Sequence, residues 1–223
     1  MRRLPIAVAS LVTALPDFAL AGLFLATWIA PGAMGPTRLR QLVLVMLVEF
    51  LVVHAAAFMG SAAFADGAPR RRAKAVLGLG GLYTLFAGGF ALAFRAWWPV
   101  LLFWGLTLNR LLGVVLGQAP SGAERALIQR GWGVATLCYL LAVCASAFLP
   151  VPALGVDRAA ISAAQLPSSG LWIEQPQRAL AAGVLYFTAL GLWELMGSRW
   201  PSATSRTSAP ARRADSTLGS NGT

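Results

Sequence analysis

The chain has 223 residues, of which 57% are hydrophobic and only 12% are charged, and its mean hydropathy is +0.68. A soluble globular domain carries about 25% charged residues, roughly twice this fraction. The composition therefore argues against a soluble enzyme or a soluble binding domain. The net charge of +10 does not indicate a nucleic-acid partner, because the basic residues flank apolar runs and form no stripe with interleaved aromatic residues.

Six apolar runs follow one another along the chain, and each has about the 20 residues that an α-helix needs to cross a bilayer. No run alternates between apolar and polar residues as the strands of a membrane β-barrel do. We therefore predict an all-α, polytopic transmembrane bundle over residues 1–197. The predicted spans are 6–30, 41–64, 75–94, 99–118, 132–150 and 179–197.

The first span, 6–30, allows two interpretations. Its basic start at Arg2 and Arg3, its apolar stretch and the Ala-Leu-Ala sequence at 19–21 are typical of a cleaved signal peptide. The sequence stays apolar well beyond this point, however, and we favour an uncleaved span. Asp17 places a carboxyl near the middle of this span.

The second span, 41–64, carries Glu49 and His54. A separation of five residues places the two side chains about 140° apart around a helix. We therefore expect them to face different neighbours. A metal-binding HExxH pattern needs two histidines on one helix face, whereas this chain has one histidine in total.

The third and fourth spans, 75–94 and 99–118, are joined by only four residues, and Pro99 suits the first turn of a helix. This spacing predicts an antiparallel helical hairpin. The fourth span carries Asn109 and Arg110 as neighbours in an otherwise apolar run.

The fifth span, 132–150, is followed by 151–177, the longest connection between spans, in which 157–166 is predicted to form a short interfacial helix. The two cysteines, Cys138 and Cys144, are about 240° apart on a helix and cannot pair with each other. Two cysteines alone do not make a zinc site either. Beyond the sixth span, residues 198–223 are rich in Ser, Thr, Ala, Pro and Arg, which predicts a disordered cytoplasmic tail.

The distribution of Lys and Arg predicts that both termini are cytoplasmic. In this orientation the inner segments hold twelve basic residues and the outer segments five, which is the bias that the positive-inside rule describes. The inner residues are Arg2, Arg3, Arg70, Arg71, Arg72, Lys74, Arg125, Arg130, Arg199, Arg206, Arg212 and Arg213, and the outer ones are Arg38, Arg40, Arg95, Arg158 and Arg178. Tryptophans, which favour the membrane interface, also fall near predicted span ends: Trp28, Trp97, Trp98, Trp132, Trp172 and Trp200.

A candidate intramembrane polar network consists of the polar side chains near the middle of the spans. Its members are Asp17, Glu49, His54, Asn109 and Arg110. An Arg or Asp in contact with lipid at this depth is unfavourable by about 2.5–3.5 kcal/mol, so we expect these groups to face the bundle and to meet one another. Two ionised carboxyls and one guanidinium sum to −1, so that either the histidine or one carboxyl carries a further proton. Such a group could carry protons across the membrane, or the network could simply hold the helices together.

Small residues on two spans predict close helix packing, either inside the bundle or between two copies of the chain. They lie at Ala56, Gly60 and Ala63 of the second span and at Gly80, Thr84, Gly88 and Ala91 of the third.

Two spans resemble those of a group of bacterial multi-pass inner-membrane proteins that are themselves uncharacterised. The resemblance lies in Met46-Leu47-Val48-Glu49-Phe50-Leu51-Val52-Val53-His54, in Gln175-Pro176-Gln177-Arg178 and in Gly183-Val184-Leu185-Tyr186-Phe187. It implies a protein of the bacterial inner membrane and carries over no catalytic role.

Two functional hypotheses follow. The leading one is a non-enzymatic assembly factor or a subunit of a membrane complex, since no nucleophile set, metal set or phosphate-binding loop is recognisable. The alternative is a small transporter or proton-conducting protein that uses Asp17, Glu49, His54 and Arg110. An intramembrane enzyme is the weakest of the interpretations. The expected partners are the lipid bilayer, other membrane proteins or further copies of the chain, and neither a cofactor nor a metal nor a nucleic acid is expected.

Overall fold

The computed structural model describes residues 6–116, 121–167 and 169–197, which form nine α-helices and no strand. Six of these helices are long and apolar enough to cross a membrane. They are α1 (Ile6–Ile29), α3 (Pro36–Phe64), α4 (Pro69–Phe94), α5 (Trp98–Val115), α6 (Gly122–Phe148) and α9 (Pro176–Gly197). The predicted all-α bundle with six membrane-spanning helices is confirmed. The predicted tail, 198–223, lies outside the described residues.

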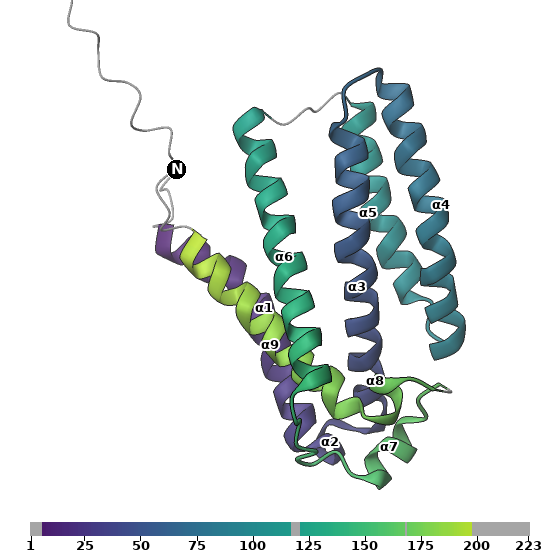
Figure 1. The fold of residues 1–223 in the computed structure, drawn as a ribbon, viewed down its shortest axis with the longest axis vertical. Helices are drawn as coiled ribbons and strands as arrows, with labels where there is room; N and C mark the ends of the chain where they lie inside the picture. The colour runs from purple at the N-terminus through teal and green to yellow at the C-terminus, as the bar shows by residue number, and fades with distance from the viewer. Residues whose placement is uncertain (1–5, 117–120, 168, 198–223) are drawn as a thin grey trace, which may run out of the picture.

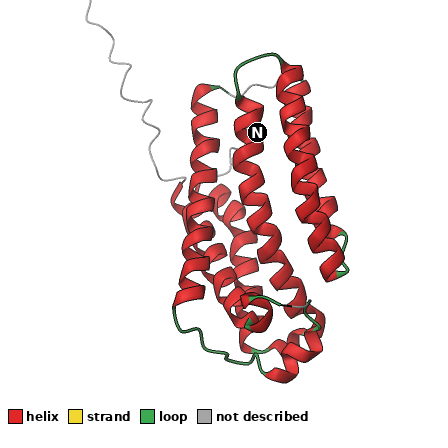
Figure 2. Ribbon diagram, turned by 45° about the vertical axis from the view of Figure 1, so that its right-hand side comes forward, coloured by secondary structure: helices red, strands yellow, loops and turns green. Residues whose placement is uncertain are grey.

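The long helices run up and down between two ends of the bundle (Figure 1). Helices α1 and α9 lie side by side and antiparallel, α3, α4 and α5 form a second group, and α6 stands between the two groups (Figures 1 and 2). The start of α1 and the end of α9 lie at one end, which we call the open end. The other end, here the capped end, carries α2 (Pro31–Met34), α7 (Arg158–Ala164) and α8 (Leu171–Glu174). Helix α7 confirms the short helix predicted within 157–166.

Five of the long helices begin before the apolar runs that predicted them, and α3, α4 and α6 do so by five residues or more. Helices α3 and α4 start at Pro36 and Pro69, because proline fits the first turn of a helix, where its missing N–H leaves no bond unmade. Helix α6 starts after Ser121, which forms a capping box with Glu124: the Ser121 hydroxyl accepts from the Glu124 N–H at 3.3 Å, and the Glu124 carboxylate accepts from the Ser121 N–H at 3.4 Å. The apolar runs therefore mark the part of each helix that suits lipid, and the helices continue through the flanking basic residues.

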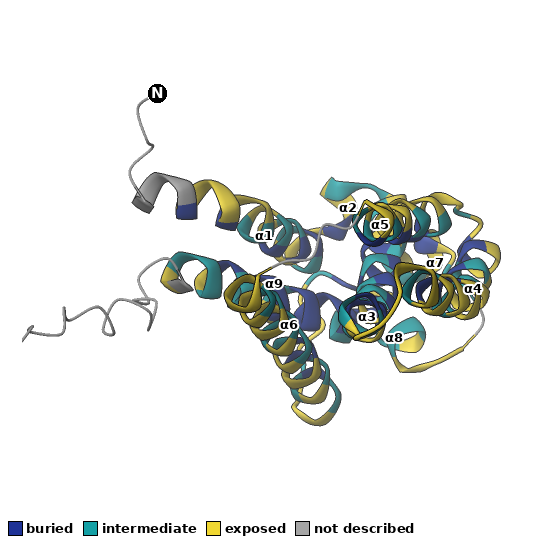
Figure 3. Cartoon of the chain, turned by 90° about the horizontal axis from the view of Figure 1, so that it is seen from above, coloured by how far each residue is buried: buried dark blue, intermediate teal, exposed yellow. Residues whose placement is uncertain are grey.

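The exterior of the bundle is apolar, as a surface in contact with lipid tails must be. Seen along the helices, exposed residues cover the outer faces, while buried residues lie where helices meet (Figure 3). Leu85 of α4, Leu101 of α5 and Leu127 of α6 are at least 70% exposed. Helix α3 is central and packs against α4, α6 and α9, among others.

Glycines allow the helices to approach each other closely. On α9, the face of Gly183 lies against the fully buried Phe24 ring of α1, where an added Cβ would stand only 2.3 Å from the ring. Gly60 of α3 meets the Trp132 ring of α6 in the same way. Gly80 of α4 faces α5, so the predicted small residues Gly60 and Gly80 pack inside the bundle, whereas Gly88 has open space where a Cβ would be. Without a hydrophobic driving force between helices in lipid, such close contacts supply much of their attraction.

Three arginines bind the carbonyl ends of neighbouring helices. Arg40 donates to the carbonyl of Phe94, the last residue of α4. Arg72 donates to a carbonyl in the last turn of α3 at 3.2 Å, and Arg178 donates to three carbonyls at the end of α6, one of them at 2.9 Å. The last carbonyls of a helix have no partner within it and carry a partial negative charge. Basic residues that predict membrane orientation thus also join adjacent helices.

Candidate functional site

The strongest polar contact inside the bundle joins α3 to α9. The hydroxyl of Tyr186 on α9 donates to the carboxylate of Glu49 on α3 at 2.6 Å. The Tyr186 ring lies edge-on to the Tyr139 ring of α6, with centroids 5.4 Å apart, and the Tyr139 hydroxyl donates to the Met46 carbonyl of α3 at 2.9 Å. Both tyrosines are at most 3% exposed. These contacts fix α3, α6 and α9 relative to one another near the middle of the bundle.

Two further carboxyls lie near this contact. Asp17 of α1 is within electrostatic range of both Glu49 and Glu194, the latter in the last turn of α9. Asp17 is partly exposed, and one carboxylate oxygen of Glu194 is buried with no hydrogen-bond partner in the described part of the chain. The antiparallel contact of α1 with α9 is what brings these groups together. We call Asp17, Glu49, Glu194, Tyr139 and Tyr186 the acid–tyrosine cluster.

Arg110 lies in a different part of the bundle. Its guanidinium donates to the carbonyls of Ala55 and Ala56 on α3, at 3.1 and 3.2 Å, and stands over the Trp132 ring of α6 at 5.6 Å. Ala55 and Ala56 are six and seven residues beyond Glu49, which places this contact about 10 Å further along α3. Arg110 therefore joins α5, α3 and α6 through backbone carbonyls and an indole.

The other two members of the predicted network have separate surroundings. His54 is partly exposed, its ring lies 4.1 Å from the Phe50 ring, and its Nδ1 lies 2.9 Å from the Phe50 carbonyl oxygen. Asn109 is exposed on α5. Glu49 and His54 have different neighbours, as their spacing predicts. Of the five predicted residues, the structure brings Asp17 close to Glu49 and places Arg110, Asn109 and His54 elsewhere.

Sequence reasoning did not assign Tyr139, Tyr186 or Glu194 to the site. A signal was available for the tyrosines, because both lie inside apolar spans, away from the interface where tyrosine is common. A buried tyrosine hydroxyl requires a hydrogen-bond partner, so each of them predicts a polar group on a neighbouring helix. Glu194 had no such signal, since its position near a span end fits a solvated carboxylate equally well.

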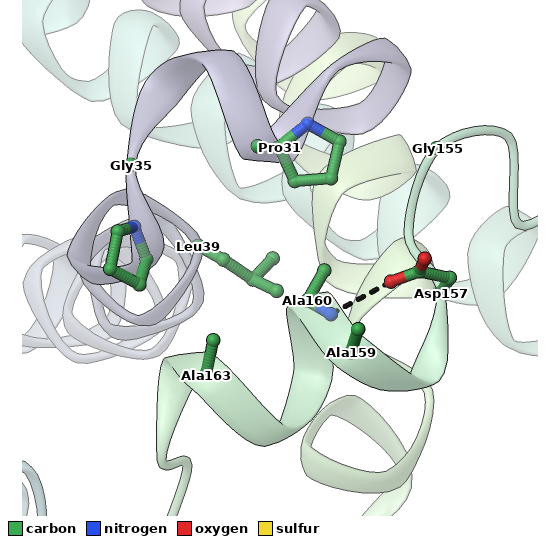
Figure 4. Close-up of a pocket in the computed structure, with 10 residues that line it drawn as sticks. Pro31, Gly35, Leu39, Gly155, Asp157, Ala159, Ala160 and Ala163 are labelled. Atoms are coloured by element: carbon green, nitrogen blue, oxygen red, sulfur yellow. Dashed lines mark hydrogen bonds between the residues drawn. The ribbon is translucent and has the colours of Figure 1, made fainter.

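A pocket of about 400 Å³ opens at the capped end between α2, the start of α3 and α7 (Figure 4). Its lining consists mainly of proline, glycine and alanine, with Leu39 between them. Asp157 also lines it, but its carboxylate is the N-cap of α7 and accepts the Ala160 N–H at 2.7 Å. The one charged side chain in the lining is therefore already used to cap a helix, and the pocket presents no other acid, base or nucleophile.

The acid–tyrosine cluster can do two things chemically. Its hydroxyls and carboxyls can hold helices together, and they can also accept and donate protons. Among the described residues, no three His, Cys, Asp or Glu side chains are arranged to hold a metal ion. No protein-family model, no curated protein and no solved structure matches this chain.

Proposed function

We propose that this protein is a non-enzymatic, multi-pass protein of the bacterial inner membrane that serves as an assembly factor or as a subunit of a larger membrane complex. The observation that carries the proposal is the use of the buried polar groups. Glu49, Tyr139 and Arg110 each contact a different helix from their own. Groups used in this way fix a bundle in one arrangement, as a scaffold or subunit requires.

Two surfaces of the bundle are suited to partner helices. Asp17 stays partly exposed near the middle of α1, where contact with lipid would be unfavourable by about 2.5–3.5 kcal/mol. A partner helix with a hydrogen-bond donor at this depth would remove that penalty. On α4, the glycines Gly78, Gly81 and Gly89 have open space where a Cβ would be, and small residues facing outward allow another helix to approach.

The proposed orientation has both termini in the cytoplasm. The start of α1 and the end of α9 share the open end, which an even number of spans requires (Figure 1). Arg70, Arg71 and Lys74, in the first turns of α4, are exposed at the same end. The positive-inside rule then places the open end in the cytoplasm and the capped end, with α7 and α8, outside.

The subunit proposal is tested by the mass of the protein in its native membrane. The tagged chain is extracted with its surrounding lipid by an amphipathic polymer, and the mass of the particles is measured. We expect a complex of fixed mass larger than one chain, which is reduced by Gly81→Leu, on the open face of α4. The matched control is Gly105→Leu on α5, where a Cβ also meets nothing within 4 Å. Particles that contain one chain only would contradict the proposal.

A proton-conducting protein is the second candidate, and the acid–tyrosine cluster favours it. Asp17 is within electrostatic range of Glu49 on one side and of Glu194, in the last turn of α9, on the other, so that three carboxyls follow one another toward the open end. The chain would be reconstituted in liposomes, and internal pH followed under an imposed potential. Flux that is lost in Glu49→Gln, while the protein stays folded, would support conduction, and the same measurement on His54→Ala tests the predicted histidine.

A matched control for the flux experiment is Glu124→Gln, because that carboxylate is exposed in the capping box of α6 and is no member of the acid–tyrosine cluster. Conduction predicts that Glu124→Gln retains the flux of the original chain. If the unaltered chain gives no flux above that of empty liposomes, conduction is refuted and the subunit proposal is unaffected.

A further inference from the structure

An open apolar groove of about 450 Å³ lies toward the capped end, between the first half of α3 and the last turns of α4 on one side and α8 on the other. Leu47, Phe90 and Phe94 line it from the long helices, and Trp172 and Ile173 line it from α8. Below this lining lies a buried cluster that includes Val43, Leu44, Val48 and Ala179. The groove therefore has a rigid floor, and its volume falls within the range of small-molecule sites, about 300–1,000 Å³.

The position of the groove limits what can fill it. Phe94 is the last residue of α4, and Trp97 and Trp98 follow after only two residues, so this part of α4 lies where the chain leaves the hydrocarbon for the interface. Leu47 and Phe90 lie one or more turns deeper in the span. A groove that starts at the interface and extends into the hydrocarbon faces the acyl chains of the surrounding leaflet.

Charged residues that adjoin the lining residues in the chain are complementary to a phospholipid headgroup. Arg40 donates to the carbonyl of Phe94, which places its guanidinium beside a residue of the groove. Arg95 is exposed and directly follows Phe94 in the chain, and on the other side Glu174 is exposed and directly follows Ile173. Arginine is the side chain that best binds phosphate oxygens, and a carboxylate can accept from a headgroup amine or hydroxyl.

We infer that this groove binds one phospholipid of the surrounding leaflet, with an acyl chain against Phe90, Phe94 and Trp172 and the headgroup phosphate at Arg95. The inference rests on membrane insertion of the bundle and not on its role in a complex. The bound lipid would fill the space between α8 and the α3–α4 pair, and so would hold α8 against the bundle.

The test counts phospholipids that stay bound when the protein is released from lipid nanodiscs into a mass spectrometer. Ala93 lines the groove and its neighbour Leu92 is exposed outside it, so Ala93→Trp fills the groove and Leu92→Trp is the matched control. We expect one retained phospholipid in the original chain and in Leu92→Trp. Ala93→Trp should weaken retention about tenfold or more, which corresponds to about 1.4 kcal/mol. Equal retention in the two Trp variants, or none in the original chain, would overturn the inference.

A second measurement uses smaller substitutions, in case the Trp variant does not fold. In a chain without Cys138 and Cys144, Ala93→Cys is labelled with a maleimide in detergent before and after phospholipid is added. Bound lipid should slow labelling at position 93 several-fold and leave Leu92→Cys unchanged. Arg95→Gln should reduce this protection, whereas Arg158→Gln, an exposed arginine of α7 at the same end, should not. Labelling at position 93 that is unaffected by phospholipid contradicts the inference.

Discussion

The contact of Gly183 with Phe24 allows a sharp prediction about how α1 and α9 are held together. In Gly183→Ala, the new Cβ would stand 2.3 Å from Cδ1 and 2.4 Å from Cε1 of a ring that is fully buried and cannot move freely. Overpacking of this kind costs about 1–3 kcal/mol, while replacing a mid-helix glycine with alanine returns about 0.5–1 kcal/mol. The net free energy of unfolding should therefore fall by up to roughly 2.5 kcal/mol.

The assay is unfolding in mixed micelles with increasing denaturing detergent, followed by helix content. Gly22→Ala is the matched control, because it lies in α1 of the same helix pair and its Cβ meets nothing within 4 Å. That control should be neutral or slightly stabilising. Adding Phe24→Leu to Gly183→Ala should recover part of the loss, since the smaller side chain leaves room for the new methyl group. A Gly183→Ala variant as stable as Gly22→Ala would refute the proposed close contact.

Two further substitutions test the polar contacts between helices. Arg110→Ala should reduce the free energy of unfolding by about 1–3 kcal/mol, because it removes two hydrogen bonds from a charged group and a contact with an indole. Its control is Asn109→Ala, which changes the exposed neighbouring residue and should have little effect. Tyr186→Phe should reduce the free energy of unfolding by about 0.6–1.7 kcal/mol, because the hydrogen bond to Glu49 is lost. Its control is Tyr83→Phe, which should leave the free energy of unfolding nearly unchanged, since the contact of Tyr83 with α5 is through its ring. Both pairs are measured by the same unfolding assay, and equal effects within either pair would contradict the assigned contact.

The number and position of the helices could be predicted because length and apolar composition report directly on membrane crossing. The starts of the helices are predicted less accurately, since the predicted spans 41–64 and 75–94 leave Arg70 to Lys74 between helices, whereas these residues form the first turns of α4. A basic residue predicts only that the side chain reaches water at the interface, and the long arginine side chain can do so from a helix. The proline before these residues was the better signal.

The pairing of helices could not be predicted from the sequence. A residue that faces lipid and a residue that faces another helix are both apolar, so hydrophobicity does not distinguish the two faces. The apolar pattern of the sequence therefore does not predict that α1 packs against α9, nor that Glu194 lies near Asp17. Arg110 illustrates a second limit, because its partners are backbone carbonyls, which every residue has.

Arg110 lies apart from the buried carboxyls, so it does not neutralise their charge through direct contact. The sequence suggests that Arg110 offsets Glu49, but the structure places the arginine about 10 Å further along α3, by the rise of the helix. Glu49 instead accepts a hydrogen bond from the Tyr186 hydroxyl, which brings no positive charge. Both proposals for function depend on this arrangement, as a fixed contact in one and as a proton path in the other.

Six crossings of the bilayer, with the open end in the cytoplasm, are tested most directly by labelling single cysteines from one side of the membrane. In a chain without its two native cysteines, Asp66→Cys lies in the α3–α4 turn at the open end, and Ala153→Cys lies in the exposed loop at the capped end. In intact cells with a permeable outer membrane, a membrane-impermeant maleimide should label position 153 at once and position 66 only after the inner membrane is opened. Labelling of both positions from the outside would contradict the transmembrane arrangement.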